Sequence, residues 1–178
     1  MKKQRKPVRK TAEERFYTAL ITLMKKNVYP SITVTDIAAG AKLSRMTFYR
    51  HFREIDDVLI RHLELVLSEA EAKIKDRRDL SKKAFWLELI RISREDPINE
   101  HLMEAGLLTK TFKTELSYMM RIYQTYFGLD MSDENAVVLV YRKLGALFGV
   151  LFYISTNNSH SDDLLANHII SIIENNNE

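Results

Sequence analysis

The segment Ile32–Val58, with the sequence ITVTDIAAGAKLSRMTFYRHFREIDDV, decides the fold of this chain. Its first part, residues 33–39, predicts a short helix whose start is capped by a Thr-x-x-Asp box. Residues 44–52 predict a second short helix, which begins with a capping serine. Gly40 is expected to end the first helix in the left-handed conformation, within a tight turn over 40–42. Two short helices joined by a tight turn indicate a helix-turn-helix.

The second short helix has the composition of an element that reads DNA. A helix that enters a major groove must be narrow and exposed on one side. Phe48 and Phe52 lie four residues apart and are expected to face inward as core. The outward residues supply cations, hydroxyls and one thioether for phosphates, base edges and thymine methyl groups: Arg45, Met46, Thr47, Tyr49 and Arg50.

Charge is distributed unevenly along the 178 residues, whose formal total is only +3. Residues 1–53 carry 13 Lys and Arg against 3 Asp and Glu, or +10, whereas the remainder carries 14 against 21, or −7. A basic tail over 1–10 does not explain this alone, because residues 11–53 still carry +4. A basic segment joined to an acidic one is typical of a nucleic-acid-binding module attached to another kind of domain. This uneven charge disfavours the alternative, in which the two short helices are an amphipathic hairpin inside an ordinary helical domain.

The rest of the sequence has helical periodicity, with no clean run of strand alternation. We predict an all-α fold of about nine helices, in which a three-helix DNA-binding domain precedes a helical dimerisation and effector domain. The expected boundaries are a basic disordered arm over 1–10, the helix-turn-helix domain over 11–53 and the C-terminal domain over 54–178. A capping box that begins at Thr11 predicts the start of the first helix, and Pro30 is expected to end it.

Composition argues against several function classes. The chain has no cysteine, which excludes disulfide scaffolds, thiolate zinc sites and cysteine nucleophiles. The five histidines lack metal-ligand spacing, and no cofactor motif or acid–base pair is apparent, so we expect no metal, no cofactor and no enzyme activity. The most apolar stretch, Leu144–Ile154, has 11 residues, whereas a bilayer needs about 20. With no secretion signal either, a cytoplasmic protein without membrane contact is expected.

Residues 11–58 resemble the DNA-binding domain of the tetracycline-repressor-like (TetR) family of bacterial transcription regulators. The resemblance is carried by Thr33-Val-Thr-Asp-Ile-Ala, Leu43-Ser-Arg, Thr47-Phe-Tyr-Arg-His-Phe52 and Asp56-Asp57-Val58. It covers roughly a quarter of the chain, and the rest fits the family in length, helical periodicity and apolar final helices. The resemblance implies a homodimer that binds a palindromic operator in double-stranded DNA.

The resemblance also implies residue roles in DNA binding. Thr33 and Thr35 would hydrogen-bond phosphates, residues 45–47 would approach bases, and residues 49–51 would lie along phosphates. The predicted DNA-binding residues are Thr33, Thr35, Lys42, Ser44, Arg45, Met46, Thr47, Tyr49, Arg50, His51 and Arg53.

The C-terminal region offers two further candidate sites. Ligand pockets are mostly aromatic and apolar, so some side chains there are candidates to line an effector cavity, with core packing as the alternative. These pocket candidates are Phe85, Trp86, Tyr118, Met119, Tyr123, Phe127, Phe148 and Phe152. Gly145 and Gly149 allow close helix approach, either within one chain or in a four-helix dimer seam. The predicted dimer-interface residues are Gly145, Phe148, Gly149, Phe152, Leu165, Ile169 and Ile172.

The sequence thus predicts a dimeric, sequence-specific transcription regulator that acts as a repressor. An effector in the C-terminal domain would lower operator affinity by favouring a state with misplaced recognition helices. The alternative is an adaptor on the same scaffold that recruits a protein partner rather than a small molecule. Lack of a sizeable cavity between the fourth and eighth helices would favour this alternative.

Overall fold

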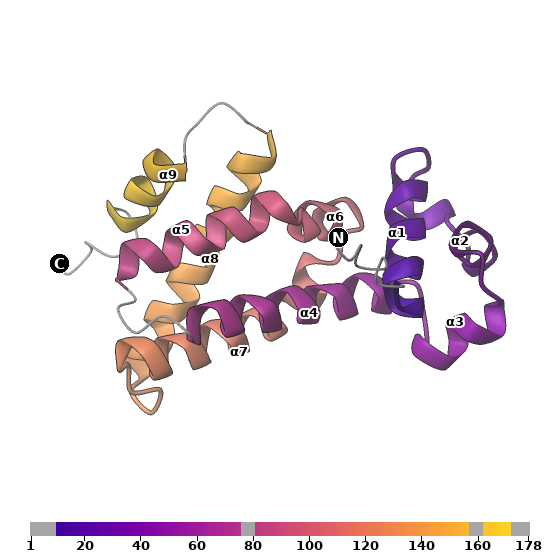
Figure 1. Ribbon diagram of the computed structural model, residues 1–178. Coiled ribbons are helices and arrows are strands. Elements are labelled where there is room, and N and C mark those ends of the chain that lie inside the picture. Colours follow the sequence, from indigo (N-terminus) through magenta and orange to yellow (C-terminus); the bar gives the residue numbers. More distant parts are fainter. Residues whose placement is uncertain (1–9, 76–80, 157–161, 172–178) are drawn as a thin grey trace, which may run out of the picture. The chain divides into compact units, whose positions relative to one another are not determined.

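The structure, a computed structural model, describes residues 10–75, 81–156 and 162–171. These residues form helices and contain no strand, which confirms the predicted all-α fold. A short 3₁₀ helix, η1 (Tyr29–Ser31), lies between the first two α-helices. The α-helices are α1 (Ala12–Met24), α2 (Val34–Ala41), α3 (Arg45–His51), α4 (Asp56–Lys75), α5 (Lys82–Glu95), α6 (Ile98–Glu104), α7 (Leu108–Phe127), α8 (Glu134–Thr156) and α9 (Asp162–Ile169) (Figure 1).

The chain divides into two compact units, residues 1–62 and 63–178. The division lies within α4, whose first turns belong to the N-terminal unit. It falls later than the domain boundary expected after residue 53, because charge and capping signals mark where α4 begins rather than where its packing partners change. Residues 1–9 of the expected arm lie outside the described residues.

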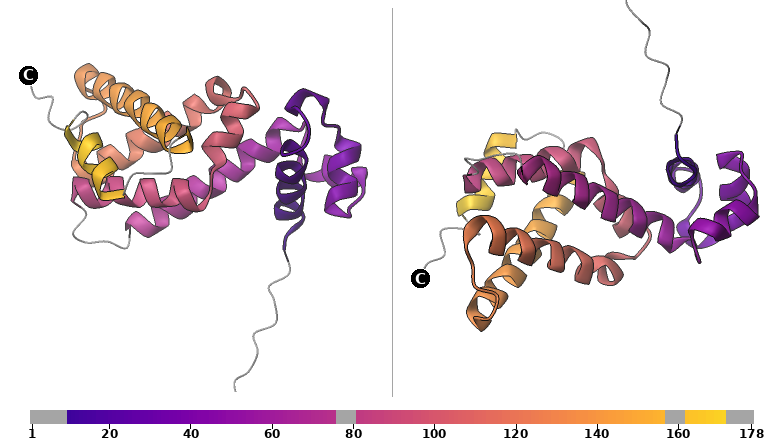
Figure 2. Two further views of the ribbon diagram at one scale, coloured as in Figure 1. Left: turned by 90° about the horizontal axis from the view of Figure 1, so that it is seen from above. Right: turned by 60° about the horizontal axis from the view of Figure 1, so that its bottom comes forward.

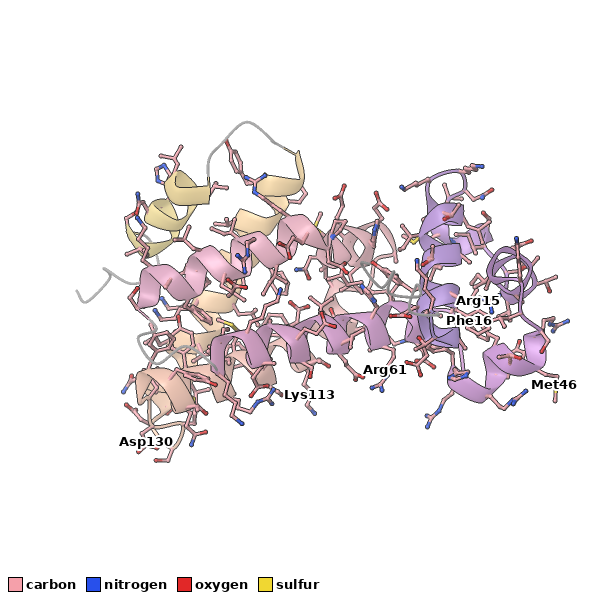
Figure 3. The ribbon with its side chains drawn as sticks, viewed as in Figure 1. Arg15, Phe16, Met46, Arg61, Lys113 and Asp130 are labelled. Carbon is pink, nitrogen blue, oxygen red and sulfur yellow. The ribbon has the colours of Figure 1, made fainter. Side chains whose placement is uncertain are left out.

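Aromatic rings form the centre of the N-terminal unit. Phe16, labelled on α1 in Figure 3, is fully buried. Its ring meets that of Phe48 of α3 edge to face, with centroids 5.3 Å apart. Phe52, which follows α3, lies 6.0 Å from Phe16 in a second edge-to-face contact. Such pairs contribute about 0.5–1.5 kcal/mol beyond the burial of their area. The inward placement predicted for Phe48 and Phe52 is confirmed, and it fixes α3 on α1.

Side-chain caps set the starts of the three short N-terminal helices. Thr11 at α1 and Thr33 at α2 each form a reciprocal capping box with the acid three residues later. At α3, the Ser44 hydroxyl accepts a hydrogen bond of 3.0 Å from the backbone amide three residues on. All three predicted caps are confirmed. Because each cap satisfies amides that have no partner within the helix, it defines where the helix begins.

The end of α2 differs from the prediction. The helix continues through Gly40, and the left-handed residue is Lys42, with φ of 53°. A Cβ on Gly40 would lie 3.2 Å from the Cβ of Ala19 on α1. The expectation that Gly40 ends the helix in the left-handed conformation was therefore wrong: this glycine permits the close approach of α2 to α1. The turn instead places a lysine in a conformation that is unfavourable for residues with a Cβ.

The end of α1 also differs from the prediction. The helix stops at Met24, where two successive amides that follow it both bond to the carbonyl of Leu23, at 2.9 and 3.0 Å. Pro30 lies beyond this point, in η1, and so does not end α1. The hydroxyl of Tyr29 donates a hydrogen bond of 2.7 Å to Asp56, which ties η1 to the start of α4. Burial and this neighbouring carboxylate raise the pKa of Tyr29 above its usual value.

The C-terminal unit has a core that is rich in aromatic residues. Phe85 and Trp86 of α5 are fully buried, and their ring centroids lie 5.1 Å apart. Phe85 also meets Tyr123 and Phe127 of α7, at 6.1 and 5.5 Å. In this unit α7 packs on α8, while α9 packs on α5 and α8 (Figure 2). The core therefore draws on helices from both ends of the unit.

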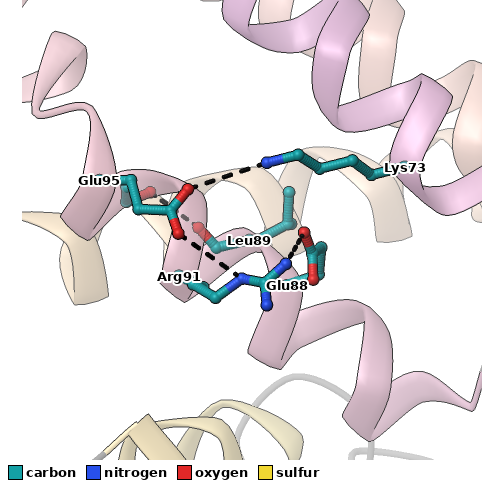
Figure 4. A network of polar contacts seen from close by, with 6 residues as sticks. Lys73, Glu88, Leu89, Arg91 and Glu95 are labelled. Atoms are coloured by element: carbon teal, nitrogen blue, oxygen red, sulfur yellow. Dashed lines mark hydrogen bonds and ion pairs between the residues drawn. The ribbon is translucent and has the colours of Figure 1, made fainter. Parts of the chain in front are cut away.

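A network of charged side chains joins α5 to α4 within this unit (Figure 4). Glu88, whose side chain is only 7% exposed, accepts a hydrogen bond of 2.7 Å from the Arg91 guanidinium. Glu95 lies 3.9 Å from Arg91 and 3.8 Å from Lys73 of α4. The buried carboxylate of Glu88 thus has a cation beside it, as expected for a charge removed from water.

Two observations concern membranes and metals. No helix in the part of the chain that the structure describes is both long and apolar enough to cross a bilayer. Within the same residues, His, Asp and Glu side chains do not gather in groups of three or more that could hold a metal ion.

Candidate nucleic-acid interface

The helix α3 presents a cationic and aromatic face to solvent. Met46 and Tyr49 are 74% and 53% exposed. Arg45 and Arg50 are also exposed on this helix. Figure 3 shows the Met46 side chain projecting from α3, away from α1. Because Phe48 anchors the opposite face, the outward side chains are held on a fixed helix and are free to meet another molecule.

Arg15 of α1 holds the turn between α2 and α3. Its Nη2 donates hydrogen bonds to the carbonyl oxygens of Ala41, at 2.5 Å, and Lys42, at 3.0 Å. A guanidinium that bonds two successive carbonyls fixes the turn on α1 and with it the direction of α3. Sequence reasoning counted Arg15 only toward net charge, because nothing in the local sequence identifies a contact with a turn so far along the chain.

Three hydroxyl groups of the predicted DNA-binding set have partners within the protein. The Thr33 hydroxyl donates to Asp36 at 2.5 Å, and this hydrogen bond lowers the pKa of the Asp36 carboxyl. The hydroxyls of Ser44 and Thr47 lie 2.9 Å apart at the start of α3. Thr33 and Ser44 are nevertheless exposed residues.

The C-terminal end of α3 is tied to both α1 and α4. Glu13 of α1 lies 3.3 Å from His51 of α3 and 3.7 Å from Arg61 of α4. The carboxylate of Asp57 accepts a hydrogen bond of 2.8 Å from the backbone amide of Arg53. These contacts place two of the predicted DNA-binding residues, His51 and Arg53, at a junction of three helices.

The predicted DNA-binding residues lie together in the N-terminal unit, over α2, the turn and α3. All are exposed except Thr47, which is half-buried: Thr33, Thr35, Lys42, Ser44, Arg45, Met46, Thr47, Tyr49, Arg50, His51 and Arg53. Their contacts with DNA stay a prediction. The arrangement supplies cations, hydroxyls and aromatic surface on one braced helix pair, as direct readout of a major groove requires.

A small cavity of about 50 Å³ lies within the C-terminal unit, among helices α4 to α8. Its lining is mostly Leu, Ile and Val side chains, with polar groups from Ser93, Asp96, Asn99, Glu115 and Tyr118. Among the predicted pocket residues, Tyr118 and Met119 line it. The structure places the others elsewhere: Phe85, Trp86 and Tyr123 in the buried core, Phe127 and Phe148 partly buried against that core, and Phe152 53% exposed.

Glu115 is the buried acid of this cavity and was missed by sequence reasoning. Its side chain accepts a hydrogen bond of 3.1 Å from the Thr111 hydroxyl, and only 5% of the residue is exposed. Burial raises the pKa of its carboxyl to about 7. One signal could have revealed it: the buried residues Thr111, Glu115, Tyr118 and Ile122 recur at helical spacing along one face of α7.

Glu115 is expected to make folding stability depend on pH. Its pKa is about 7 in the folded protein against an ordinary value of 4.5, so the folded state holds this proton more tightly. The stabilisation is therefore fully present below pH 4.5 and lost as pH rises through 7. Between pH 5 and pH 8 the free energy of unfolding should therefore fall by about 2–3 kcal/mol through this group. Urea unfolding at several pH values should show this loss in the wild type and not in Glu115→Gln. If the unfolding free energies of the two proteins changed with pH in parallel, the prediction would be contradicted.

One face of α8 carries apolar residues that point to solvent. Val138, Tyr141 and Phe152 are 52%, 46% and 53% exposed. Gly145 and Gly149 lie between them at helical spacing, and a Cβ added to either glycine would meet nothing within 4 Å. Among the described residues, therefore, no side chain packs closely on either glycine. We call these five residues the α8 stripe.

The other predicted dimer-interface residues are placed differently. Phe148 is partly buried, with its ring 6.0 Å from that of Phe112. Leu165 of α9 is 5% exposed and belongs to the core. Ile172 and the side chain of Ile169 lie outside the described part of the structure. The dimer interface itself stays a prediction.

This architecture was compared with those of known proteins. No protein-family model and no curated protein matches the sequence. Among solved structures, the Lin0861 protein of Listeria innocua is similar with a TM-score of 0.73 at 17% identity, over 95% of each chain. The fatty acid degradation regulator FadR of Bacillus halodurans has a TM-score of 0.68 at 13% identity, over 93% of this chain and 99% of its own.

A third similar structure identifies the fold class. A TetR-family transcriptional regulator of Bordetella parapertussis has a TM-score of 0.59 at 13% identity, over 94% of this chain and 96% of its own. An N-terminal helix-turn-helix unit followed by a C-terminal helical unit is thus an architecture that solved transcription regulators share. The chain has the TetR-like fold.

Proposed function

We propose that this protein is a sequence-specific DNA-binding transcriptional regulator that represses its target genes. The observation that carries the proposal is the exposed cationic and aromatic face of α3. Phe48 packs α3 on α1, and Arg15 of α1 holds the turn that precedes α3. The regulators of similar fold support the same class of function. In this function Arg45, Met46 and Thr47 approach base edges, while Tyr49, Arg50 and His51 follow phosphates.

The α8 stripe supports a homodimer that binds a palindromic operator. An exposed apolar face with two glycines allows a second copy of α8 to approach closely. A two-fold dimer presents two copies of α3, which meet half-sites about 34–36 Å apart or a multiple of that distance. The acidic C-terminal unit is expected to stay away from phosphates.

Binding of an effector in the C-terminal unit is the proposed control of DNA affinity. The cavity of about 50 Å³ is well below the roughly 300–1,000 Å³ typical of drug-sized ligands. This size favours a small effector, or else the alternative of an adaptor that recruits a protein partner through the same unit. An effector acts only to the extent that it binds one state of the dimer better than the other.

The experiment that tests the proposal selects bound DNA fragments from the source genome with the full-length protein. We expect recovery of an inverted repeat, with affinity that falls steeply as salt rises. Transcription in vitro from a promoter that holds this repeat should decrease when the protein is added. Recovery of fragments without a shared motif would overturn the proposal of sequence-specific binding.

Lys42 offers a variant in which stability and DNA binding should change in opposite directions. Lys42→Gly relieves a left-handed conformation and is expected to raise the unfolding free energy by about 0.5–1 kcal/mol. It also removes an exposed cation, so operator affinity should fall. The slope of log affinity against log salt concentration should decrease by about one. Urea unfolding and binding titrations at several salt concentrations measure the two effects. Lys42→Arg, which keeps the charge, serves as the control for DNA binding.

A further inference from the structure

We propose that the cavity among α4 to α8 binds a small primary amine, with the Glu115 carboxylate as the counter-ion of its ammonium group. The inference rests on the proposed effector-controlled function and names the chemical class of the effector. It is carried by the burial of Glu115, the polar atoms beside it in the cavity and the sign of the charges that line it.

The two buried glutamates of the C-terminal unit differ in their partners. Glu88 has the guanidinium of Arg91 at 2.7 Å. Glu115 is equally buried, and its partner is the neutral hydroxyl of Thr111 at 3.1 Å. Among the described residues that line the cavity, none is Lys or Arg. A cationic ligand would supply the countercharge that Glu115 lacks among the described residues.

Two other polar groups that line the cavity are buried. Among the residues that the structure describes, the Oδ1 atom of Asn99 and the hydroxyl of Tyr118 have no hydrogen-bond partner, and Tyr118 is only 3% exposed. The amide oxygen and the ionised carboxylate only accept hydrogen bonds, and the phenol oxygen accepts as well as donates. An ammonium group carries three N–H donors and no acceptor, so it matches this set. A carboxylate ligand could accept from the Tyr118 hydroxyl, but it would place a second negative charge beside ionised Glu115.

The remaining lining sets the size of the ligand. Leu63, Leu89, Leu144 and Leu147 contribute apolar walls. A cavity of about 50 Å³ holds an ammonium group and a short alkyl chain. Leu67 and Tyr118 also line an open groove between α4 and α7, so they form the wall between the cavity and solvent. Movement of these two side chains would admit the ligand.

The test compares three ligands of similar shape and different charge on the full-length protein. Thermal unfolding is followed with increasing n-propylamine, n-propanol or propionate at constant ionic strength and pH 8. We expect n-propylamine to raise the unfolding temperature in a saturable manner, and the neutral and anionic counterparts to lack this effect. Equal stabilisation by n-propanol, or no stabilisation by the amine, would overturn the proposal.

Variants show whether the amine binds at Glu115. Glu115→Gln keeps the shape and can still accept the Thr111 hydrogen bond, and it should weaken amine binding at least about tenfold. Tyr118→Phe removes one acceptor and should weaken it several-fold. Glu134→Gln, on the exposed start of α8, is the matched control and should bind as the wild type does. Wild-type affinity in Glu115→Gln would overturn the assignment of the counter-ion.

The pH dependence of binding gives a second readout. Because bound ammonium favours ionised Glu115, the amine must displace a proton at low pH, and its affinity should fall about tenfold between pH 8 and 6. Asp96 and Tyr118 are the other titratable groups in the lining. Asp96→Asn should keep this pH dependence, and Glu115→Gln should lose it. Amine binding is measured without DNA, so its failure is distinguishable from a failure of operator binding.

Discussion

Phe48→Ala is expected to destabilise the N-terminal unit by about 3–5 kcal/mol and to abolish operator binding at ordinary temperatures. The ring of Phe48 is fully buried and meets the rings of Phe16 and Phe52. Removing a buried phenylalanine side chain costs this much because the cavity left behind cannot collapse fully. Small domains have only about 5–15 kcal/mol of stability, so much of it would be lost. Urea unfolding and a binding titration measure the two losses.

The next residue provides the control. Tyr49 is 53% exposed, so Tyr49→Ala should change the unfolding free energy by less than about 1 kcal/mol. It should nevertheless weaken operator binding by about 1–3 kcal/mol, and Arg45→Ala should do the same. Neighbouring positions on α3 would then separate folding from recognition. Unchanged operator affinity in both Tyr49→Ala and Arg45→Ala would contradict the assignment of α3 as the recognition helix.

Gly149→Arg is expected to convert the proposed dimer to a monomer. The substitution places a long cation on the α8 stripe, where the partner helix must approach closely. A Cβ at this position meets nothing within 4 Å, and glycine disfavours a helix interior, so the monomer itself should fold normally. Light scattering after size exclusion should show half the mass. Affinity for the palindrome should fall by about 10²-fold or more, because the second half-site no longer binds in the same event.

A control for this variant adds the same charge away from the stripe. Gln124→Arg lies on an exposed position of α7 and should leave both the dimer and operator binding intact. Circular dichroism on both variants establishes that each is folded. If Gly149→Arg stays dimeric, the interface lies on another surface of the C-terminal unit.

Local signals predicted the fold well where a single side chain decides the structure. The caps at Thr11, Thr33 and Ser44 are confirmed because each involves residues only three apart. Gly40 was assigned to the turn because glycine favours positive φ, yet its role depends on Ala19, which is distant in sequence. The contact that fixes the turn, from Arg15, is equally non-local. Pairing of this kind cannot be derived from helical periodicity.

The candidate sites follow the same rule. The exposed residues of α3 could be predicted, because capping and spacing determine which face of a short helix is outward. The cavity could not be predicted, because its lining comes from five helices. The sequence of one helix does not determine how it packs against the other four. Aromatic composition suggested Phe85 and Trp86 as pocket residues, but both fill the core. Glu115 is the polar residue that buried spacing on α7 could have revealed.

The helix α3, which we propose reads DNA, has only 7 residues. Isolated helices shorter than about 12–15 residues are marginal in water, so α3 exists as a helix only while Phe16 and Arg15 of α1 hold it. A peptide of residues 44–52 alone would be largely unstructured. It would lose its conformational entropy on binding DNA, which would weaken its affinity. During synthesis, likewise, the growing chain acquires its reading surface only after this segment has emerged and docked on α1.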